Sequence, residues 1–155
     1  MKKSLRMMIM ALCLTLLVPC VALALSRSTG SVGTVAVQSA LADEVVRQVN
    51  LERTRRGLGG LRVSAELNRA ARVRANEITR KFSHTRPDGT PWRTVSSAAY
   101  GENIARGQRT ADKVMAAWMT SSGHRANILR ASYGSIGVCA VSSGGVTHWV
   151  QLFGK

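Results

Sequence analysis

The segment SIGVCAVSSGGVTHWVQLF, residues 135–153, indicates the fold of the chain more directly than any other stretch. It holds two apolar runs, residues 135–141 and 146–153, on either side of Ser-Ser-Gly-Gly. A two-residue connection through Gly144 and Gly145 is typical of a type I′ turn, in which both central residues adopt a positive φ. The segment therefore predicts an antiparallel β-hairpin at the end of the chain.

This hairpin has two apolar faces. The two-residue turn pairs Ala140 with Trp149 and Ile136 with Phe153, which places these four side chains on one face. The opposite face then carries a second apolar set, namely Cys139, Val141, Val150 and Leu152. Because both faces need to be covered, we expect a sheet with helices on each side and an α+β fold.

The sequence before the hairpin predicts three helices. Apolar residues at helical spacing place them near residues 40–56, 64–80 and 110–121. Ser64 and Thr110 are the expected N-caps of the second and third helices. Gly57 and Gly123 are the expected end signals of the first and third. A short helical turn is expected over residues 124–129.

An N-terminal targeting segment is expected over residues 1–24. Basic residues precede an apolar run from Met7 to Val18, and Ala22-Leu23-Ala24 is a small-residue cleavage site, as in secretory signal peptides. An uncleaved membrane anchor is the alternative, because residues 7–25 are just long enough to span a bilayer. Cleavage predicts a secreted protein, extracellular or associated with the cell wall, with no transmembrane segment left.

The remaining sequence predicts a flexible linker over residues 25–39 and one domain over residues 40–155. The linker is rich in Ser, Gly, Thr and Val, which is typical of a tether. Cys139 is the only cysteine beyond the signal segment. No intramolecular disulfide can form in the mature chain, so the domain depends on its apolar core.

The chain is strongly basic, with 22 Lys and Arg against 8 Asp and Glu. Without Lys2, Lys3 and Arg6 of the signal segment, the mature net charge is 19 − 8 = +11. This charge predicts attraction to an anionic wall polymer or to lipid headgroups outside the cell, while a solvated, arginine-rich helix face is the alternative interpretation. Nucleic acid is not an expected partner, because the chain is exported and lacks a basic patch interleaved with aromatic residues.

Three polar clusters lie within about forty residues, at 82–84, 100–105 and 122–129. They contain two of the three histidines and one of the eight acidic residues. Histidine and carboxylate groups bind metals, relay protons or hold loops together. We therefore expect the functional site in these clusters.

These clusters also carry a family resemblance. From about Leu41 to Lys155 the chain resembles the CAP superfamily (cysteine-rich secretory proteins, antigen 5 and plant pathogenesis-related 1) in its short bacterial form. The motifs are, in chain order, VNLER at 49–53, FSHTRPDG at 82–89, GENIA at 101–105, AWMTSSGHRANIL at 117–129, IGV at 136–138 and WVQLFG at 149–154. The resemblance implies a three-layer α-β-α sandwich with a small antiparallel sheet.

The resemblance further implies a cleft with two histidines and two glutamates that binds a divalent metal, often zinc, in some members. His84 and His124 take the histidine positions and Glu102 takes one glutamate position. Ser121 stands where the second glutamate is expected. Asn103 and Trp92 are expected to line the same cleft beside Ser121.

Two interpretations of the cleft follow from the missing glutamate. Two imidazoles and one carboxylate can hold zinc with a water in the fourth position. The same three groups can instead form a buried hydrogen-bonded cluster that holds loops together. We expect a secreted binding or interaction module for an unidentified extracellular ligand, which is either a small molecule or a divalent metal. The alternative is a metal-assisted hydrolase acting on peptide or cell-wall material, against which the missing carboxylate argues.

Overall fold

The structure is a computed structural model that describes residues 29–155, with side chains described from residue 36. The predicted signal segment therefore lies outside the described residues. The elements are α1 (Thr29–Thr54), β1 (Arg62–Val63), α2 (Ala65–Arg80), the 3-10 helix η1 (Trp92–Val95), β2 (Gly101–Arg106), α3 (Ala111–Thr120), α4 (Ser122–Ile128), β3 (Ser135–Ser143) and β4 (Val146–Gly154). Within residues 29–155, no helix has the length and apolar character needed to cross a bilayer.

The predicted hairpin forms with the predicted register. β3 and β4 are antiparallel, and Ala140 lies opposite Trp149 while Ile136 lies opposite Phe153. Gly144 and Gly145 have φ of 56° and 75°, as a type I′ turn requires. The turn and the apolar alternation therefore set the strand pairing without help from distant residues.

The hairpin is the centre of a four-stranded sheet with the order β1-β3-β4-β2. β2 is antiparallel to β4, but β1 is parallel to β3, so the sheet is mixed rather than wholly antiparallel. The parallel pairing of β1 arises from the connection that follows it. Ser64 caps α2 directly after β1, and α2 carries the chain across the sheet towards β2. β2 was not predicted. Its polar residues contact other parts of the protein, so β2 lacks the alternation of apolar and polar residues that is typical of a strand with one solvent-exposed face.

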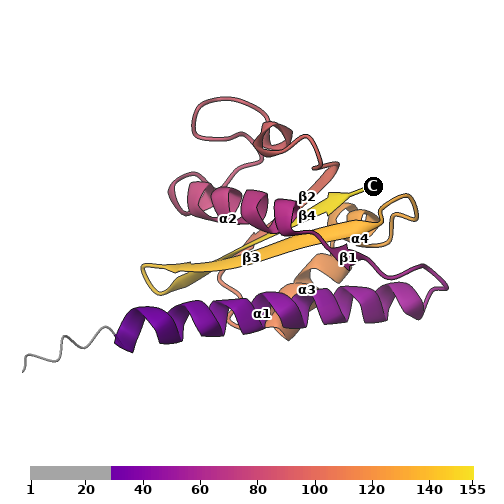
Figure 1. Ribbon diagram of the computed structural model, residues 1–155, viewed down its shortest axis with the longest axis horizontal. Coiled ribbons are helices and arrows are strands. Elements are labelled where there is room, and N and C mark those ends of the chain that lie inside the picture. Colours follow the sequence, from indigo (N-terminus) through magenta and orange to yellow (C-terminus); the bar gives the residue numbers. More distant parts are fainter. Residues whose placement is uncertain (1–28) are drawn as a thin grey trace, which may run out of the picture.

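Helices cover both faces of the sheet and complete the α-β-α sandwich (Figure 1). α1 and α3 pack on the face that carries Trp149 and Phe153, and Trp118 of α3 is buried there. α2 packs on the face that carries Val150 and Leu152. The two faces of the hairpin are thus buried in two separate apolar clusters, as the sequence predicts.

The packing of α2 on β3 requires a glycine at position 137. A Cβ atom there would lie 2.2 Å from the backbone carbonyl carbon of Leu67, a separation that real Cβ atoms do not adopt. The backbone of α2 therefore lies directly on β3. This close contact fixes the height of α2 above the sheet and the position of every side chain that α2 sends towards β2.

The first helix is longer than predicted. α1 begins at Thr29 rather than near Ser39 or Ala40, so the prediction of a flexible linker is wrong for residues 29–39. Once a helix has formed on a packed segment, each added residue needs only propagation and not a new nucleus. Weak helix formers next to the packed part of α1 therefore extend it.

The predicted starts of the second and third helices are confirmed, but one predicted end is wrong. Leu67 N donates to Ser64 Oγ at 3.2 Å, and Lys113 N donates to Thr110 Oγ1 at 3.3 Å. Gly123 does not end the third helix, because α3 stops at Thr120 and Gly123 lies inside α4. The extended backbone of Ser121, with φ of −79° and ψ of 123°, makes the corner between the two helices.

Candidate functional site

The three polar clusters come together at β2. Glu102 and Asn103 lie on β2, His84 lies in the loop after α2, and His124 lies on α4. Asn103 Nδ2 donates to the backbone oxygen of His124 at 3.1 Å. Asn127 Nδ2, also on α4, donates to the backbone oxygen of Glu102 at 3.2 Å. Asparagine amides thus hold α4 against the strand that carries the glutamate.

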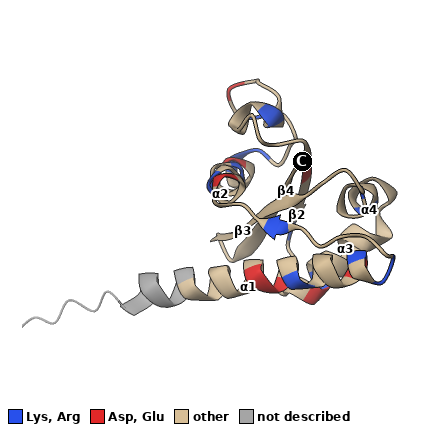
Figure 2. Ribbon diagram, turned by 45° about the vertical axis from the view of Figure 1, so that its right-hand side comes forward, with Lys and Arg blue, Asp and Glu red and all other residues tan. Residues whose placement is uncertain are grey.

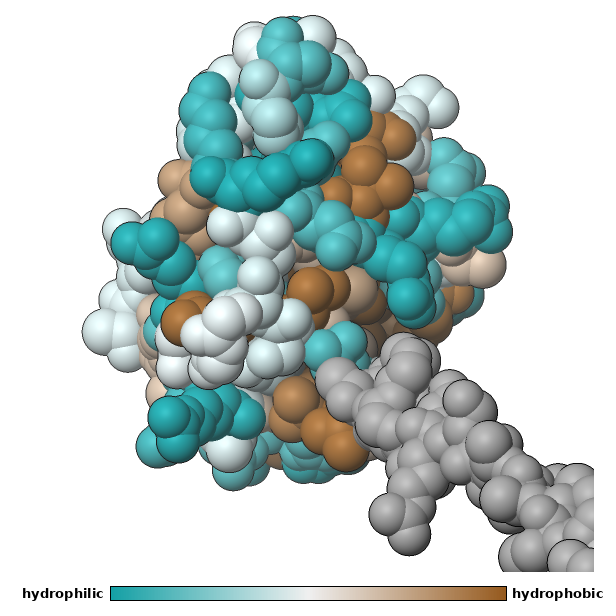
Figure 3. Space-filling view, turned by 90° about the vertical axis from the view of Figure 1, so that its left-hand side faces the viewer, coloured by the Kyte–Doolittle hydropathy of each residue, from teal (hydrophilic) through white to brown (hydrophobic). Residues whose placement is uncertain are grey.

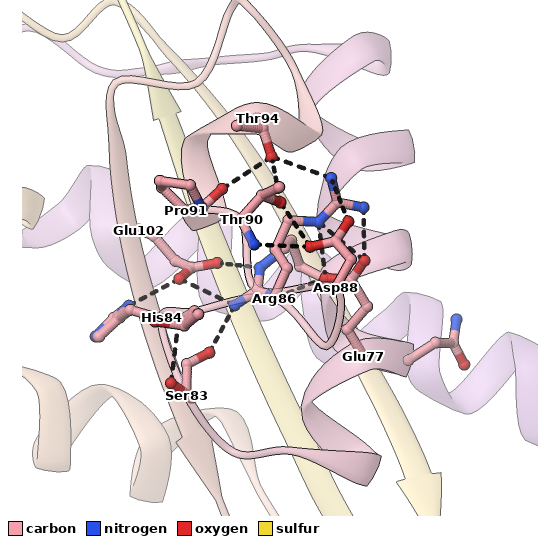
Figure 4. A network of polar contacts seen from close by, with 12 residues as sticks. Glu77, Ser83, His84, Arg86, Asp88, Thr90, Pro91, Thr94 and Glu102 are labelled. Carbon is pink, nitrogen blue, oxygen red and sulfur yellow. Dashed lines mark hydrogen bonds and ion pairs between the residues drawn. The ribbon is translucent and has the colours of Figure 1, made fainter.

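The carboxylate of Glu102 is buried and has two positively polarised neighbours. Its side chain is 0% exposed. Arg74 Nε donates to one carboxylate oxygen at 2.7 Å. His84 Nδ1 contacts the other at 2.7 Å (Figure 4). A second Arg74 nitrogen lies 3.3 Å from the oxygen that His84 contacts. Both oxygens of Glu102 are therefore taken by groups of the protein itself.

Arg74 is the residue of this site that sequence reasoning missed. The sequence places it in a run of basic residues typical of a solvated helix face, yet its side chain is 0% exposed. It donates to Glu102, to Glu77 at 2.6 Å and to the backbone oxygen of Ser83 at 2.8 Å. The signal was present in the sequence, because Arg74 follows Ala71 by three residues and precedes Ile78 by four, on the apolar stripe of α2.

Glu77 extends the network to the loop of the Pro-Asp-Gly turn. Arg86 donates to Glu77 Oε1 at 2.7 Å through one terminal nitrogen and at 3.0 Å through Nε. Burial raises the pKa of Glu77, but the hydrogen bonds from Arg86 and Arg74 outweigh it and leave the pKa below its usual value. The positive charges of Arg74 and Arg86 therefore balance the negative charges of Glu77 and Glu102 beneath the loop that carries His84.

The two histidines differ in their surroundings. The side chain of His84 is 53% exposed, and its Nδ1 faces the ionised carboxylate of Glu102. When this imidazole is neutral, its proton stays on Nδ1 and Nε2 keeps a free lone pair. His124 is half-buried; burial, and then the nearby His84, lower its pKa. The site therefore places the partly buried imidazole of α4 near an oriented one from the loop after α2.

The residues present do not fit the three-ligand zinc site that the sequence predicted. In the part of the chain that the structure describes, no three His, Cys, Asp or Glu side chains are placed to hold one metal ion together. A cation at Glu102 would also be repelled by the guanidinium of Arg74, which already contacts that carboxylate. Glu102 thus serves to hold Arg74 and to orient His84, and only His84 and His124 remain as nitrogen donors.

The other three residues predicted to line the cleft, Asn103, Ser121 and Trp92, lie in different surroundings. Asn103 is fully buried and donates to Gln151 Oε1 at 3.0 Å, so its side chain is not available to a ligand. Ser121 is partly exposed at the corner before α4, three residues from His124. Trp92 is half-buried against the apolar cluster under α2, and its backbone N donates to the backbone oxygen of His84 at 2.9 Å. Trp92 therefore supports the His84 loop.

The sequence of this chain matches a known family. Residues 46–153 match the profile of the CAP family, the cysteine-rich secretory protein family. YkwD of Bacillus subtilis, described as an uncharacterised protein, is 39% identical over 123 residues, which cover 74% of this chain and 47% of that protein. The chain thus spans about half the length of this curated relative.

Solved structures share the fold. An extracellular protein containing a SCP domain from Bacillus anthracis has a TM-score of 0.68 at 21% identity, covering 79% of this chain and 42% of that chain. An outer surface protein from Borrelia burgdorferi has a TM-score of 0.64 at 22% identity, covering 72% of this chain and 89% of that chain. With the sandwich fold, the GEN segment on β2 and the SGHR segment at α4 in place, the chain belongs to the CAP family of cysteine-rich secretory proteins.

Proposed function

We propose that this CAP domain is a secreted binding module whose cleft, at His84 and His124, recognises an extracellular ligand by hydrogen bonding. The observation that supports it is the buried ion pair between Arg74 and Glu102, with an Nε to carboxylate distance of 2.7 Å. Glu102, the one glutamate of the cleft, is bonded to Arg74 and so has a structural role. The ligand therefore meets imidazole groups instead of a free carboxylate.

A hydrolytic mechanism that uses a carboxylate as its general base lacks a free carboxylate at this site. A general base has to reach the proton that it removes, at hydrogen-bond distance and with a free lone pair. Glu102 is enclosed by Arg74 and His84, and Ser121 cannot act as a base near neutral pH without help. The imidazoles of His84 and His124 keep lone pairs, but among the described residues no third metal ligand accompanies them. Recognition without turnover is therefore the function that we infer for this arrangement.

Metal-assisted hydrolysis is the second candidate, and one contact favours it. Histidines that ligate metals commonly donate their other ring nitrogen to a carboxylate, which orients the ring. His84 makes this contact with Glu102. A metal held by His84 and His124 alone would have two protein ligands, fewer than the three of common catalytic zinc sites.

Zinc titration of the secreted protein separates these two functions. For the binding module, isothermal titration gives weak zinc affinity that Ser121→Glu does not raise, and a panel of peptides and muropeptides is not cleaved in the presence of zinc. For the metal-assisted hydrolase, Ser121→Glu raises zinc affinity about 10–100-fold, as added partners around a metal commonly do. Zinc-dependent cleavage that is lost in His84→Ala would overturn our proposal.

The positive charge gives the domain a second, less specific mode of attraction. Lys and Arg are spread over α1, α2, the strands and the loops, and no single face carries them all (Figure 2). We expect the secreted protein to bind an anionic wall polymer or anionic lipid headgroups through this charge. Cosedimentation with anionic vesicles should fall strongly between 0.1 M and 1 M salt, as the Debye length falls from about 10 Å to about 3 Å. Binding that ignores salt would contradict this expectation.

A further inference from the structure

The outer face of α2 carries a row of exposed arginines. Arg69, Arg72 and Arg80 are exposed, and Val73 and Asn76 lie between them on the same face. At 3.6 residues per turn, these five positions fall within about 100° around the helix axis, and at 1.5 Å per residue they extend over about 16 Å. The buried residues of α2 lie on the opposite side, against the sheet. The row therefore points away from the core.

The charges of this row are not paired within the protein. Ion pairs involve other arginines, namely Arg47, Arg55, Arg56, Arg74 and Arg86. Within residues 29–155, no ion pair involves Arg69, Arg72 or Arg80. These three guanidinium groups therefore keep all of their N–H donors for an external partner.

The acids near the row do not cancel its charge. Glu66 of α2 accepts from Ser96 Oγ at 2.5 Å, and Glu77 is bonded to Arg74 and Arg86. Asp43 of α1 lines the hollow that Arg72 borders, and it is the one acid of that lining among the described residues. Three arginines against one acid leave a net charge of +2 on this face, so an anionic partner is favoured.

The surroundings of α2 favour a chain over a flat membrane. In Figure 1 and in Figure 2, the loop after α2 extends past this helix on the side away from α1. A bilayer would meet that loop before it could lie along α2, whereas a linear polymer can follow the helix. Val73, 46% exposed, is the one apolar member of the row. Seen from the end at which α1 begins, hydrophobic side chains form no single large patch that could enter lipid (Figure 3).

The chemistry of arginine favours phosphate as the anionic group. A guanidinium presents two parallel N–H donors that match two oxygens of one phosphate. A polymer with repeated phosphates can engage several arginines of the row at once, and each contact after the first is then intramolecular. A single phosphate can engage one arginine only and should bind far more weakly.

We propose that the outer face of α2 binds a linear polyanion with repeated phosphate groups, and that Arg69, Arg72 and Arg80 hold it. This inference rests on the charge-driven attraction proposed above and assigns that attraction to one face and one class of partner. It uses no residue of the cleft at His84 and His124. A polymer bound here would therefore leave the cleft open for its own ligand.

Two variants with equal net charge test the proposal on the secreted protein. Binding of a labelled linear polyphosphate is measured by fluorescence anisotropy over a range of salt concentrations. Replacing the three arginines of the row by Gln should reduce affinity at least about tenfold and should lower the slope of log affinity against log salt by about 2, because three phosphate contacts are lost. The control carries the same charge change at exposed residues away from α2, namely Arg109→Gln, Lys113→Gln and Lys155→Gln. The control should lose less than about threefold in affinity.

Three further measurements complete the test. The arginine Nε resonances of Arg69, Arg72 and Arg80 in the parent should shift when polyphosphate is added, and orthophosphate at the same phosphate concentration should shift them far less. His84→Ala should bind polyphosphate like the parent, so failure of the cleft as a binding site would leave this result unchanged. Anionic phosphatidylglycerol vesicles should respond equally to the two triple variants. Equal losses of polyphosphate affinity in both triple variants, shifts confined to other arginines, or vesicle binding that depends on the α2 row would overturn the proposal.

Discussion

Arg53 on α1 and Arg74 on α2 are both buried, but their charges are neutralised in different ways. Among residues 29–155, Arg53 donates to backbone oxygens alone, those of Gly59, Ile128, Arg130 and Tyr133. Arg74 donates to the carboxylates of Glu102 and Glu77. One guanidinium is therefore held by peptide dipoles, and the other by full charges.

The difference shows in the pKa of the two groups. Burial lowers the pKa of Arg53, and no carboxylate compensates for it. Burial also lowers the pKa of Arg74, but the hydrogen bonds to Glu102 and Glu77 outweigh it and raise the pKa above its usual value. Arg53 thus joins the loop after α4 to the end of α1. Arg74 instead joins α2 to the carboxylates of Glu102 and Glu77. The following predictions test this comparison.

The largest loss of stability is expected for Arg74→Met. This change leaves the buried Glu102 with His84 alone and takes from Glu77 one of its two guanidinium partners. Breaking a buried pair in this way costs about 3–5 kcal/mol. Urea unfolding measures the loss. Arg69→Met, on the exposed side of the same helix, is the control and should change stability by less than about 0.5 kcal/mol. Equal effects of the two changes would show that Arg74 is not a buried partner.

The loss in Arg74→Met should depend on pH. Because the pKa of Glu77 is lowered in the folded protein, its contribution to stability is complete above the unfolded pKa of about 4.3 and disappears as the pH falls through the folded value. As the pH falls from about 4.3 through the folded value, the parent loses the part of this contribution that Arg74 supplies, while Arg86 supplies its part in both proteins. The unfolding free energies of parent and variant should therefore approach each other in this range. A gap that stays constant from pH 7 to pH 3 would contradict the ionic role of Arg74.

Arg53→Met should cost somewhat less, about 3 kcal/mol. Two of its contacts, to the backbone oxygens of Ile128 and Tyr133, are buried, and each unsatisfied buried group costs about 1–3 kcal/mol. No carboxylate contacts Arg53 among the described residues, so this loss should be independent of pH between 4 and 8. Urea unfolding across that range checks both statements. A pH-dependent loss would remove the distinction between the two arginines.

Glu102→Gln should have a smaller effect, about 1.5–3 kcal/mol, the range for a hydrogen bond to a charged group. The amide keeps the shape of the side chain, and Arg74 keeps its ion pair with Glu77. Thermal melts at pH 7 give the size of the effect. A loss as large as that of Arg74→Met would mean that Glu77 contributes nothing to holding the arginine.

The smallest effect on stability is expected for His84→Ala, about 0–1 kcal/mol. Its side chain is half exposed, and exposed ion pairs contribute little. Thermal melts of the variant should therefore be close to those of the parent. If ligand binding is lost while stability is kept, His84 acts in recognition; a large loss of stability would instead make the contact with Glu102 structural.

Several features could be predicted from the residues alone because they depend on neighbours in the chain. The hairpin register follows from Gly144-Gly145 and from the apolar alternation on each side. The helix starts at Ser64 and Thr110 follow from capping side chains that bond backbone groups three residues ahead. The motifs around His84, Glu102 and His124 indicated the family and the three segments that meet at the site.

Which groups of that site are free, and which are already bonded within the protein, was decided by the tertiary structure alone. Whether Glu102 is a free ligand or the partner of a buried arginine depends on α2, whose Arg74 is 28 residues away in the sequence and which is set down on β3 at Gly137. β2 likewise becomes a strand only because β4 is there to pair with it. Whether a charge is buried depends on packing between segments that are distant in the sequence. Local sequence therefore specifies turns, helix caps and the apolar faces of helices and strands. Long-range packing determines which polar groups remain free.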